Sequence, residues 1–223
     1  HSSHIVAESE FDDIKYFVKE TNSNGFNVVS KNLKDLRTLY QKEKGEKNNH
    51  FKFLKQYLTL NRSEVFFADK IILIEGDTER ILLPAMIKKI DQDNNYDIPL
   101  MSQNISIIEV GNYSEIYSTF IKFIGAKVLI ITDIDTYSFT DDVDDNGKPK
   151  KNRDGSIKKK QTPCRVSDGK YTSNSSLKFY LKDQLETNTG TEKDILTNLE
   201  LREKVVSADE VYNEETGKTE IVW

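Results

Sequence analysis

Two pairs of carboxylates stand where they could hold a divalent cation. Glu75 directly follows an aliphatic run, and Glu79 comes four residues later. Asp133 and Asp135 follow a second aliphatic run. Like charges that lie together raise each other's pKa, so four neighbouring carboxylates favour a bound cation. Oxygen ligands suit Mg²⁺, with Mn²⁺ as a substitute, and Mg²⁺ commonly bridges carboxylates to a substrate phosphate. We therefore predict a Mg²⁺ site that acts on phosphate esters.

Each of these acids also has a simpler explanation. A carboxylate such as Glu79 is favoured near the start of any helix, because the helix dipole attracts negative charge there. An Asp-x-Asp pair after a strand occurs in several kinds of Mg²⁺ enzyme. Gly76, next to Glu75, indicates a positive φ or a close backbone approach. The order of the two motifs along the chain is therefore more specific than either motif alone.

The elements around the acids predict a parallel sheet. Continuous aliphatic runs are typical of buried parallel strands, and runs with helical spacing alternate with them here. The expected order is strand, helix, strand, helix, strand, over 70–74, 77–90, 105–110, 114–124 and 127–132. Sites in such sheets form at the carboxyl ends of the strands. If the first and third strands are neighbours, all four acids share one edge, and an extended segment would point Asp133 and Asp135 the same way.

The segments that flank this core are more polar. Residues 1–62 are expected to form a mostly helical lead-in, with a helix over 8–19. Residues 63–223 are expected to form the main domain. A polar, turn-rich insertion over 138–162 predicts either a solvated hairpin or a basic finger that contacts phosphates.

Four lysines of the main domain are the candidate DNA contacts. They are Lys158, Lys159, Lys160 and Lys170. The segment from Glu192 to Lys204 is expected to be helical, and a hairpin is expected around residues 214–217.

Composition excludes several classes of protein. The 223 residues are 36% hydrophobic and 10% aromatic, which is too rich for a disordered chain. No apolar stretch approaches the ~20 residues of a membrane helix. The single cysteine, Cys164, permits no intrachain disulfide, and we expect a cytoplasmic protein without a membrane. The net charge of −5 speaks against a general nucleic-acid coat.

At the acidic motifs the sequence resembles a known family. The segments Ile74-Glu75-Gly76-Asp77-Thr78-Glu79 and Thr132-Asp133-Ile134-Asp135 are similar to the Toprim domain of topoisomerases, primases and OLD-family (overcoming lysogenisation defect) nucleases. The segments 66–70, 81–84 and 164–174 resemble the OLD family in particular. The resemblance implies a Toprim-like, Rossmann-like α/β fold with a mostly parallel sheet flanked by helices.

The resemblance also implies a function. In that family an ABC-type ATPase domain precedes Toprim, and His1-Ser2-Ser3-His4-Ile5 resembles its last motif, so we expect a C-terminal fragment of a longer protein. ATP would then bind only through the upstream domain. The implied activity is a metal-dependent DNA endonuclease, often in anti-phage defence. Its carboxylate ligands would be Glu75, Glu79, Asp133 and Asp135, which would hold two ions. The resemblance also implies a homodimer.

Two points stay open in the sequence. OLD nucleases carry a basic residue after Asp-x-Asp, which is not placed here, and Lys170 is a weak candidate. A non-catalytic module for DNA docking or dimerisation is an alternative, with an apolar face at Phe51, Leu54 and Leu58 as the contact surface. A primase-like or topoisomerase-like enzyme is a third possibility.

Overall fold

The computed structural model describes residues 3–22, 25–44, 49–61, 63–94, 96–182, 206–207, 209–213 and 218–222. The chain divides into two compact units, which are described one at a time. The first unit comprises residues 1–131 and 205–223, and the second comprises residues 132–204.

Among the described residues, the first unit holds most of the helices and eight of the eleven strands. Its α-helices are α1 (Ser3–Glu8), α2 (Leu33–Lys44), α3 (His50–Asn61), α4 (Asp77–Asp93) and α5 (Ser118–Ile124). Its short 3₁₀ helices are η1 (Phe11–Asp13), η2 (Ser63–Phe67), η3 (Leu100–Ser102) and η4 (Ser114–Tyr117). Its strands are β1 (Lys15–Asn22), β2 (Gly25–Asn32), β3 (Lys70–Ile74), β4 (Ile105–Glu109), β5 (Lys127–Ile130), β9 (Val206–Ser207), β10 (Asp209–Asn213) and β11 (Lys218–Val222).

The central sheet of the first unit has the strand order β4-β3-β5-β9. β3 pairs in parallel with both β4 and β5, and β9 adds an antiparallel edge. The prediction of a mostly parallel sheet with flanking helices is therefore confirmed. The first and third predicted strands are neighbours, with Leu73 opposite Ile130, as the argument about the four acids requires.

The burial of this sheet explains its sequence. All residues of β3 after Lys70 are buried, which suits a strand that is covered on both faces. Six of the seven residues of α5 are buried, and Gly125 ends this helix in the left-handed conformation at φ 72°. By contrast, α4 buries none of its side chains within the described residues. Ile81, for example, is 70% exposed.

The lead-in packs against the sheet through an aromatic and aliphatic core. Leu54 and Leu58 of α3 are fully buried, and Phe11 meets Phe51 edge-on at 5.9 Å between ring centroids. Phe66 meets Phe120 of α5 in the same manner at 5.7 Å. The apolar face of α3 is thus covered by the chain's own core, and it is not the exposed dimer surface that the sequence suggested.

Part of the lead-in is a hairpin, so the helix expected over residues 8–19 is wrong. β1 and β2 pair antiparallel from Lys15 opposite Asn32 to Asn22 opposite Gly25. The reason lies in the residue types: aromatic and β-branched residues such as Tyr16, Phe17 and Val18 favour strands. Gly25, the first residue of β2, has a φ of 129°, which glycine adopts without a steric penalty.

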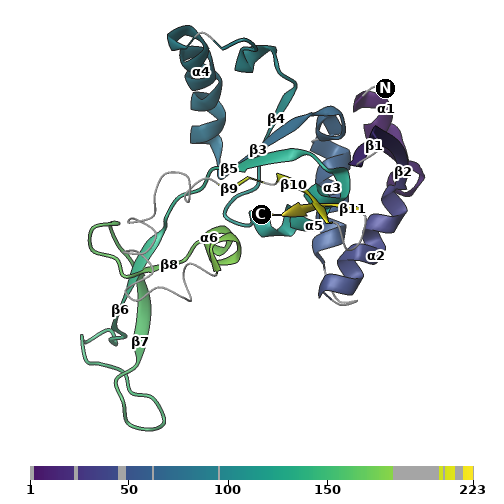
Figure 1. The fold of residues 1–223 in the computed structure, drawn as a ribbon. Helices are drawn as coiled ribbons and strands as arrows, with labels where there is room; N and C mark the ends of the chain where they lie inside the picture. Colours follow the sequence, from purple (N-terminus) through teal and green to yellow (C-terminus); the bar gives the residue numbers. More distant parts are fainter. Residues whose placement is uncertain are drawn as a thin grey trace. The chain divides into compact units, whose positions relative to one another are not determined.

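The second unit is built on a three-stranded antiparallel sheet. Its elements are β6 (Thr136–Asp141), β7 (Lys159–Pro163), β8 (Tyr171–Thr172) and α6 (Ser175–Tyr180), with the strand order β7-β6-β8. We call residues 136–182 the arm. Figure 1 shows that β6 and β7 run together into a long hairpin away from β8 and α6. Gly147 and Gly155 make two further turns in it, at φ 76° and 86°, where the sequence predicts turns.

The C-terminal part of the chain is described only in short pieces. β10 and β11 pair antiparallel, which confirms the hairpin expected there. The helix expected over Glu192–Lys204 lies outside the described residues. Among the residues searched, no helix is both long and apolar enough to cross a membrane.

Candidate functional site

Asp133 and Asp135 belong to the second unit, where they line one hollow. Its volume is about 490 Å³, and its wall also includes Thr136, Cys164 and Arg165. Both aspartates are exposed to solvent. Two aspartates and an arginine therefore line the same hollow, and their charges suit a cation together with a phosphate group.

The loop that carries the two aspartates is held by the segment Thr172–Asn174. The Asn174 Nδ2 donates to Thr132 Oγ1 at 2.7 Å. Ser173 donates twice to the carbonyl of Asp135, from its backbone N at 2.8 Å and from its hydroxyl at 3.1 Å. Thr172 donates from its hydroxyl to the carbonyl of Ile134. Three successive residues of one segment thus hydrogen-bond to three residues of the loop.

Asn174 has two roles in this arrangement. Its side chain is fully buried. Its Oδ1 accepts from the backbone N of Leu177 at 3.1 Å, which caps the first turn of α6. Its Nδ2 meanwhile holds Thr132. One side chain therefore joins the start of α6 to the aspartate loop.

The backbone at Asp135 is unusual. Its φ is 50°, and it is the non-glycine residue with positive φ within the described part of the chain. The extended segment expected from the sequence is therefore interrupted at Asp135, whose φ lies in the left-handed region. Such conformations concentrate at functional sites.

The backbone of Gly169 approaches Thr136, the residue that follows the aspartate loop, very closely. A Cβ added at Gly169 would stand 2.3 Å from the Cβ of Thr136 and 2.6 Å from its Oγ1. Thr136 in turn donates to the carbonyl of Cys164 at 3.0 Å. No Cβ fits at that distance. Position 169, beside the first residue of β6, therefore requires glycine.

Glu75 and Glu79 belong to the first unit, at the carboxyl end of β3. Glu79 is the third residue of α4, and its Oε2 accepts from the backbone N of Gly76 at 2.9 Å. This hydrogen bond is half of a capping box, and it places the carboxylate in the first turn of α4, where the simpler explanation expects it. Asp77, on the same turn, pairs with Arg80 at 2.6 Å.

Gly76 does not show the geometry expected from the sequence. Its φ is −161°, which any residue adopts, and the nearest atom to an added Cβ is 3.9 Å away. The reason is that the turn after β3 is closed by the Glu79 cap rather than by a left-handed glycine.

The four candidate ligands thus form two pairs, one in each unit. Within the described parts of the chain, no three His, Cys, Asp or Glu side chains are gathered into a group that could hold a metal. The chemistry of each pair nevertheless suits a hard cation, because all the donors are carboxylate oxygens. A carboxylate has about four acceptor positions, so the single bond to Gly76 leaves Glu79 capacity for a cation.

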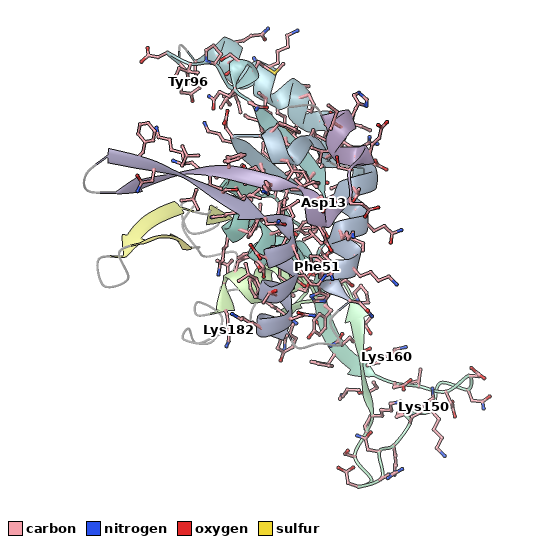
Figure 2. The ribbon with its side chains drawn as sticks, turned by 90° about the vertical axis from the view of Figure 1, so that its right-hand side faces the viewer. Asp13, Phe51, Tyr96, Lys150, Lys160 and Lys182 are labelled. Carbon is pink, nitrogen blue, oxygen red and sulfur yellow. The ribbon has the colours of Figure 1, made fainter. Side chains whose placement is uncertain are left out.

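The candidate DNA contacts differ in their surroundings. Lys158 pairs with Asp142 at 3.3 Å, and Lys159 pairs with Asp141. Hydrogen bonds from Lys150 and Lys158 lower the pKa of Asp142. Lys160 and Lys170 are exposed and form no ion pair among the described residues. Figure 2 shows Lys160 on the strand that leads to the distal part of the arm, where Lys150 lies.

Two residues of the site were not identified by sequence reasoning. Arg165 lines the hollow, whereas Lys170, the weak candidate for the basic residue, is not part of its wall. Asn174 is the buried residue that holds the aspartate loop through Thr132. Both lie in the stretch 164–174, whose family resemblance was the available signal.

Comparison with known proteins gives two matches. Residues 66–135 match the family model described as "Overcoming lysogenization defect protein-like, TOPRIM domain". The chain is 30% identical over 189 residues to Endonuclease GajA from Bacillus cereus (strain HuB5-5), a match that covers 82% of this chain and 24% of that protein. The chain therefore spans about a quarter of the length of this curated relative. No solved structure matches.

Proposed function

Residues 66–135 are an OLD-like TOPRIM domain, and from this premise we propose that the chain is the nuclease module of a DNA endonuclease that depends on a divalent metal. The observation that carries the proposal is the pair Asp133 and Asp135 in one hollow with Arg165. The relative named above is an endonuclease, which supports the same reaction class, the hydrolysis of phosphodiester bonds.

We propose that Glu75, Glu79, Asp133 and Asp135 hold Mg²⁺, with Mn²⁺ as a substitute and two ions in all. When bound, such ions supply a water of lowered pKa and stabilise negative charge on phosphoryl oxygens. The donor set supports this assignment, because carboxylates are the protein ligands that Mg²⁺ prefers.

The chain's own residues position the reaction in this proposal. Asn174 and Ser173 hold the aspartate loop in one conformation, so the carboxylates need little reorganisation when a cation arrives. Arg165 contributes a permanent positive charge at the same hollow. Its guanidinium matches a phosphate through two parallel hydrogen bonds, which orients the scissile group.

The wider protein belongs to the proposal as well. We propose that an ABC-type ATPase domain lies upstream and supplies ATP dependence. We also propose that the protein acts in the cytoplasm as a homodimer in anti-phage defence. The short coverage of the relative, 24% of its length, is consistent with a larger protein. Light scattering measures the molar mass of the chain in solution, and a homodimer should have twice the mass of one chain.

The test is conversion of supercoiled plasmid in Mg²⁺ or Mn²⁺. We expect nicking or linearisation by the chain, and loss of both with EDTA, Asp133→Asn or Glu75→Gln. Asp97→Asn, at an exposed acid outside the candidate site, is the matched control and should cleave normally. If the chain alone is inactive, the same variants are tested in a longer piece that includes the predicted ATPase.

Three results would contradict the proposal. Cleavage that survives Asp133→Asn would remove the carboxylates from the mechanism. A covalent protein–DNA adduct would indicate a topoisomerase-like enzyme, and DNA binding without cleavage in the longer piece would indicate a docking module.

A further inference from the structure

One face of the arm carries a group of aromatic side chains. On β6, Tyr137 and Phe139 point to the same face, because they are two residues apart in a strand. Tyr171 of β8 is paired with Tyr137 in the register and joins them. The ring of Phe139 lies 5.5 Å from that of Tyr137 and 5.4 Å from that of Tyr171.

Phe139 is held in place and still open to solvent. Its contacts with the two tyrosine rings are edge-on, at interplanar angles of 86° and 67°. Tyr137 is buried at 7% exposure, whereas Phe139 is 49% exposed. A large apolar ring that is fixed by its neighbours loses little conformational entropy when a ligand stacks on it.

The arm is basic within an acidic chain. Residues 136–182 contain eleven Lys and Arg against six Asp, whereas the whole chain has a net charge of −5. Lys178 stands 5.8 Å from the ring centroid of Tyr137, next to the aromatic face. Lys159 lies on that face too, and its exposed ion pair with Asp141 opens at little cost. The charge of this surface suits a polyanion.

The aromatic face is close along the strand to the hollow of the candidate site. Thr136 begins β6 and lines the hollow with Asp133 and Asp135. Phe139 points to the opposite face of this strand from Thr136, because the spacing of three residues is odd, and it lies about 10 Å farther along. That length equals about three stacked base steps of DNA.

From these observations we infer that the aromatic face of the arm binds a single strand of DNA, with an unpaired base stacked on Phe139 and phosphates near Lys159 and Lys178. This inference rests on the proposed function for the choice of DNA. A single strand is favoured over a duplex because the faces of paired bases are covered by their neighbours. Aromatic side chains bind single strands by stacking, without preference for sequence.

Binding of a fluorescent single-stranded oligonucleotide and of its duplex tests the inference. EDTA is present, so that cleavage is not required. We expect Phe139→Ala to weaken single-strand binding about 5- to 100-fold and to weaken duplex binding by less than twofold. Phe53→Ala is the matched control, because Phe53 is also 49% exposed but belongs to α3 of the first unit. It should bind both DNA forms as the unchanged chain does.

Two further measurements distinguish stacking from charge. The slope of log affinity against log salt should stay unchanged in Phe139→Ala and decrease in Lys178→Ala, because only the lysine contacts phosphate. Phe139→Trp in a Trp223→Phe background should retain affinity, and its fluorescence should be quenched by the single strand. Trp223 is the only tryptophan of the chain, so this background has no other signal.

The outcomes separate this inference from the proposed function. Equal losses in Phe139→Ala and Phe53→Ala, or no loss in either, would overturn the inference while plasmid cleavage remains unaffected. A change of oligomeric state in Phe139→Ala with unchanged DNA binding would also overturn it, since the face would then contact protein. If Phe139→Ala selectively loses single-strand binding but the unchanged chain never cleaves DNA, this inference is supported and the proposed nuclease function is not.

Discussion

The link between Asn174 and Thr132 permits a quantitative test of how the aspartate loop is held. Serine is as good a helix N-cap as asparagine, so Asn174→Ser preserves the start of α6. Its side chain is too short to reach Thr132 Oγ1, which Asn174 Nδ2 contacts at 2.7 Å. The loss of a buried hydrogen bond at a fully buried residue costs about 1–3 kcal/mol. Asn174→Ala should cost about 1 kcal/mol more, because the cap is lost as well.

The assay combines two measurements. Urea denaturation gives the change in the free energy of unfolding, and hydrogen exchange of the Ser173 amide reports the loop directly, since that amide donates to Asp135. The matched control is Asn152→Ser. The Asn152 Nδ2 donates to Ser156 at 3.0 Å on the exposed tip of the arm, so we expect a change below about 0.5 kcal/mol.

A double-mutant cycle decides whether the two residues act on each other. Thr132→Val removes the acceptor at nearly constant volume, and the cycle with Asn174→Ser should give a coupling of about 1 kcal/mol. A coupling below about 0.3 kcal/mol, together with unchanged exchange at Ser173, would refute the argument that Asn174 holds the loop.

Three other predictions concern single positions. Gly169→Ala should lower the free energy of unfolding by at least about 1–3 kcal/mol, measured by urea denaturation, because its Cβ would overlap Thr136; stability equal to that of the unchanged chain would contradict the close approach. Glu79→Gln should keep the hydrogen bond to Gly76, so the midpoint of thermal unfolding should not change. Mn²⁺ binding, measured by calorimetry, should weaken. An unchanged Mn²⁺ affinity would limit Glu79 to its capping role. The pKa of Asp142 is lowered by its lysine partners, so its contribution to the hairpin is present above the unfolded pKa and is lost as the pH falls through the lower folded value; NMR titration of its carboxyl carbon should show the low value, and substitution of either lysine by Ala should raise it.

The sequence predicts the sheet well because its signals are local. The buried residues of β3 are all aliphatic, and Gly125 marks the end of α5 by its own conformation. The parallel pairing of β3 with β5 follows from the alternation of strands and helices. The burial of each strand and the end of each helix depend on residues that are near one another in the chain.

The rest of the site depends on contacts between distant residues. Asn174 meets Thr132 across 42 positions of sequence, and no local pattern specifies such a partner. The sequence pattern misleads at β1 for a different reason. Phe11, Ile14, Phe17 and Val18 have approximately helical spacing, but the pairing of β1 with β2 outweighs that pattern.

The conformation of Asp135 has a consequence for protein engineering. Position 135 requires a residue that tolerates a φ of 50°. This conformation favours glycine, asparagine and aspartate. If the residue at position 135 also ligates a cation, it must carry a carboxylate. Aspartate alone meets both demands, because glycine and asparagine lack the charge and glutamate does not favour this backbone. A library randomised at position 135 and selected for cleavage should therefore return a single amino acid, while one selected only for folding should return three.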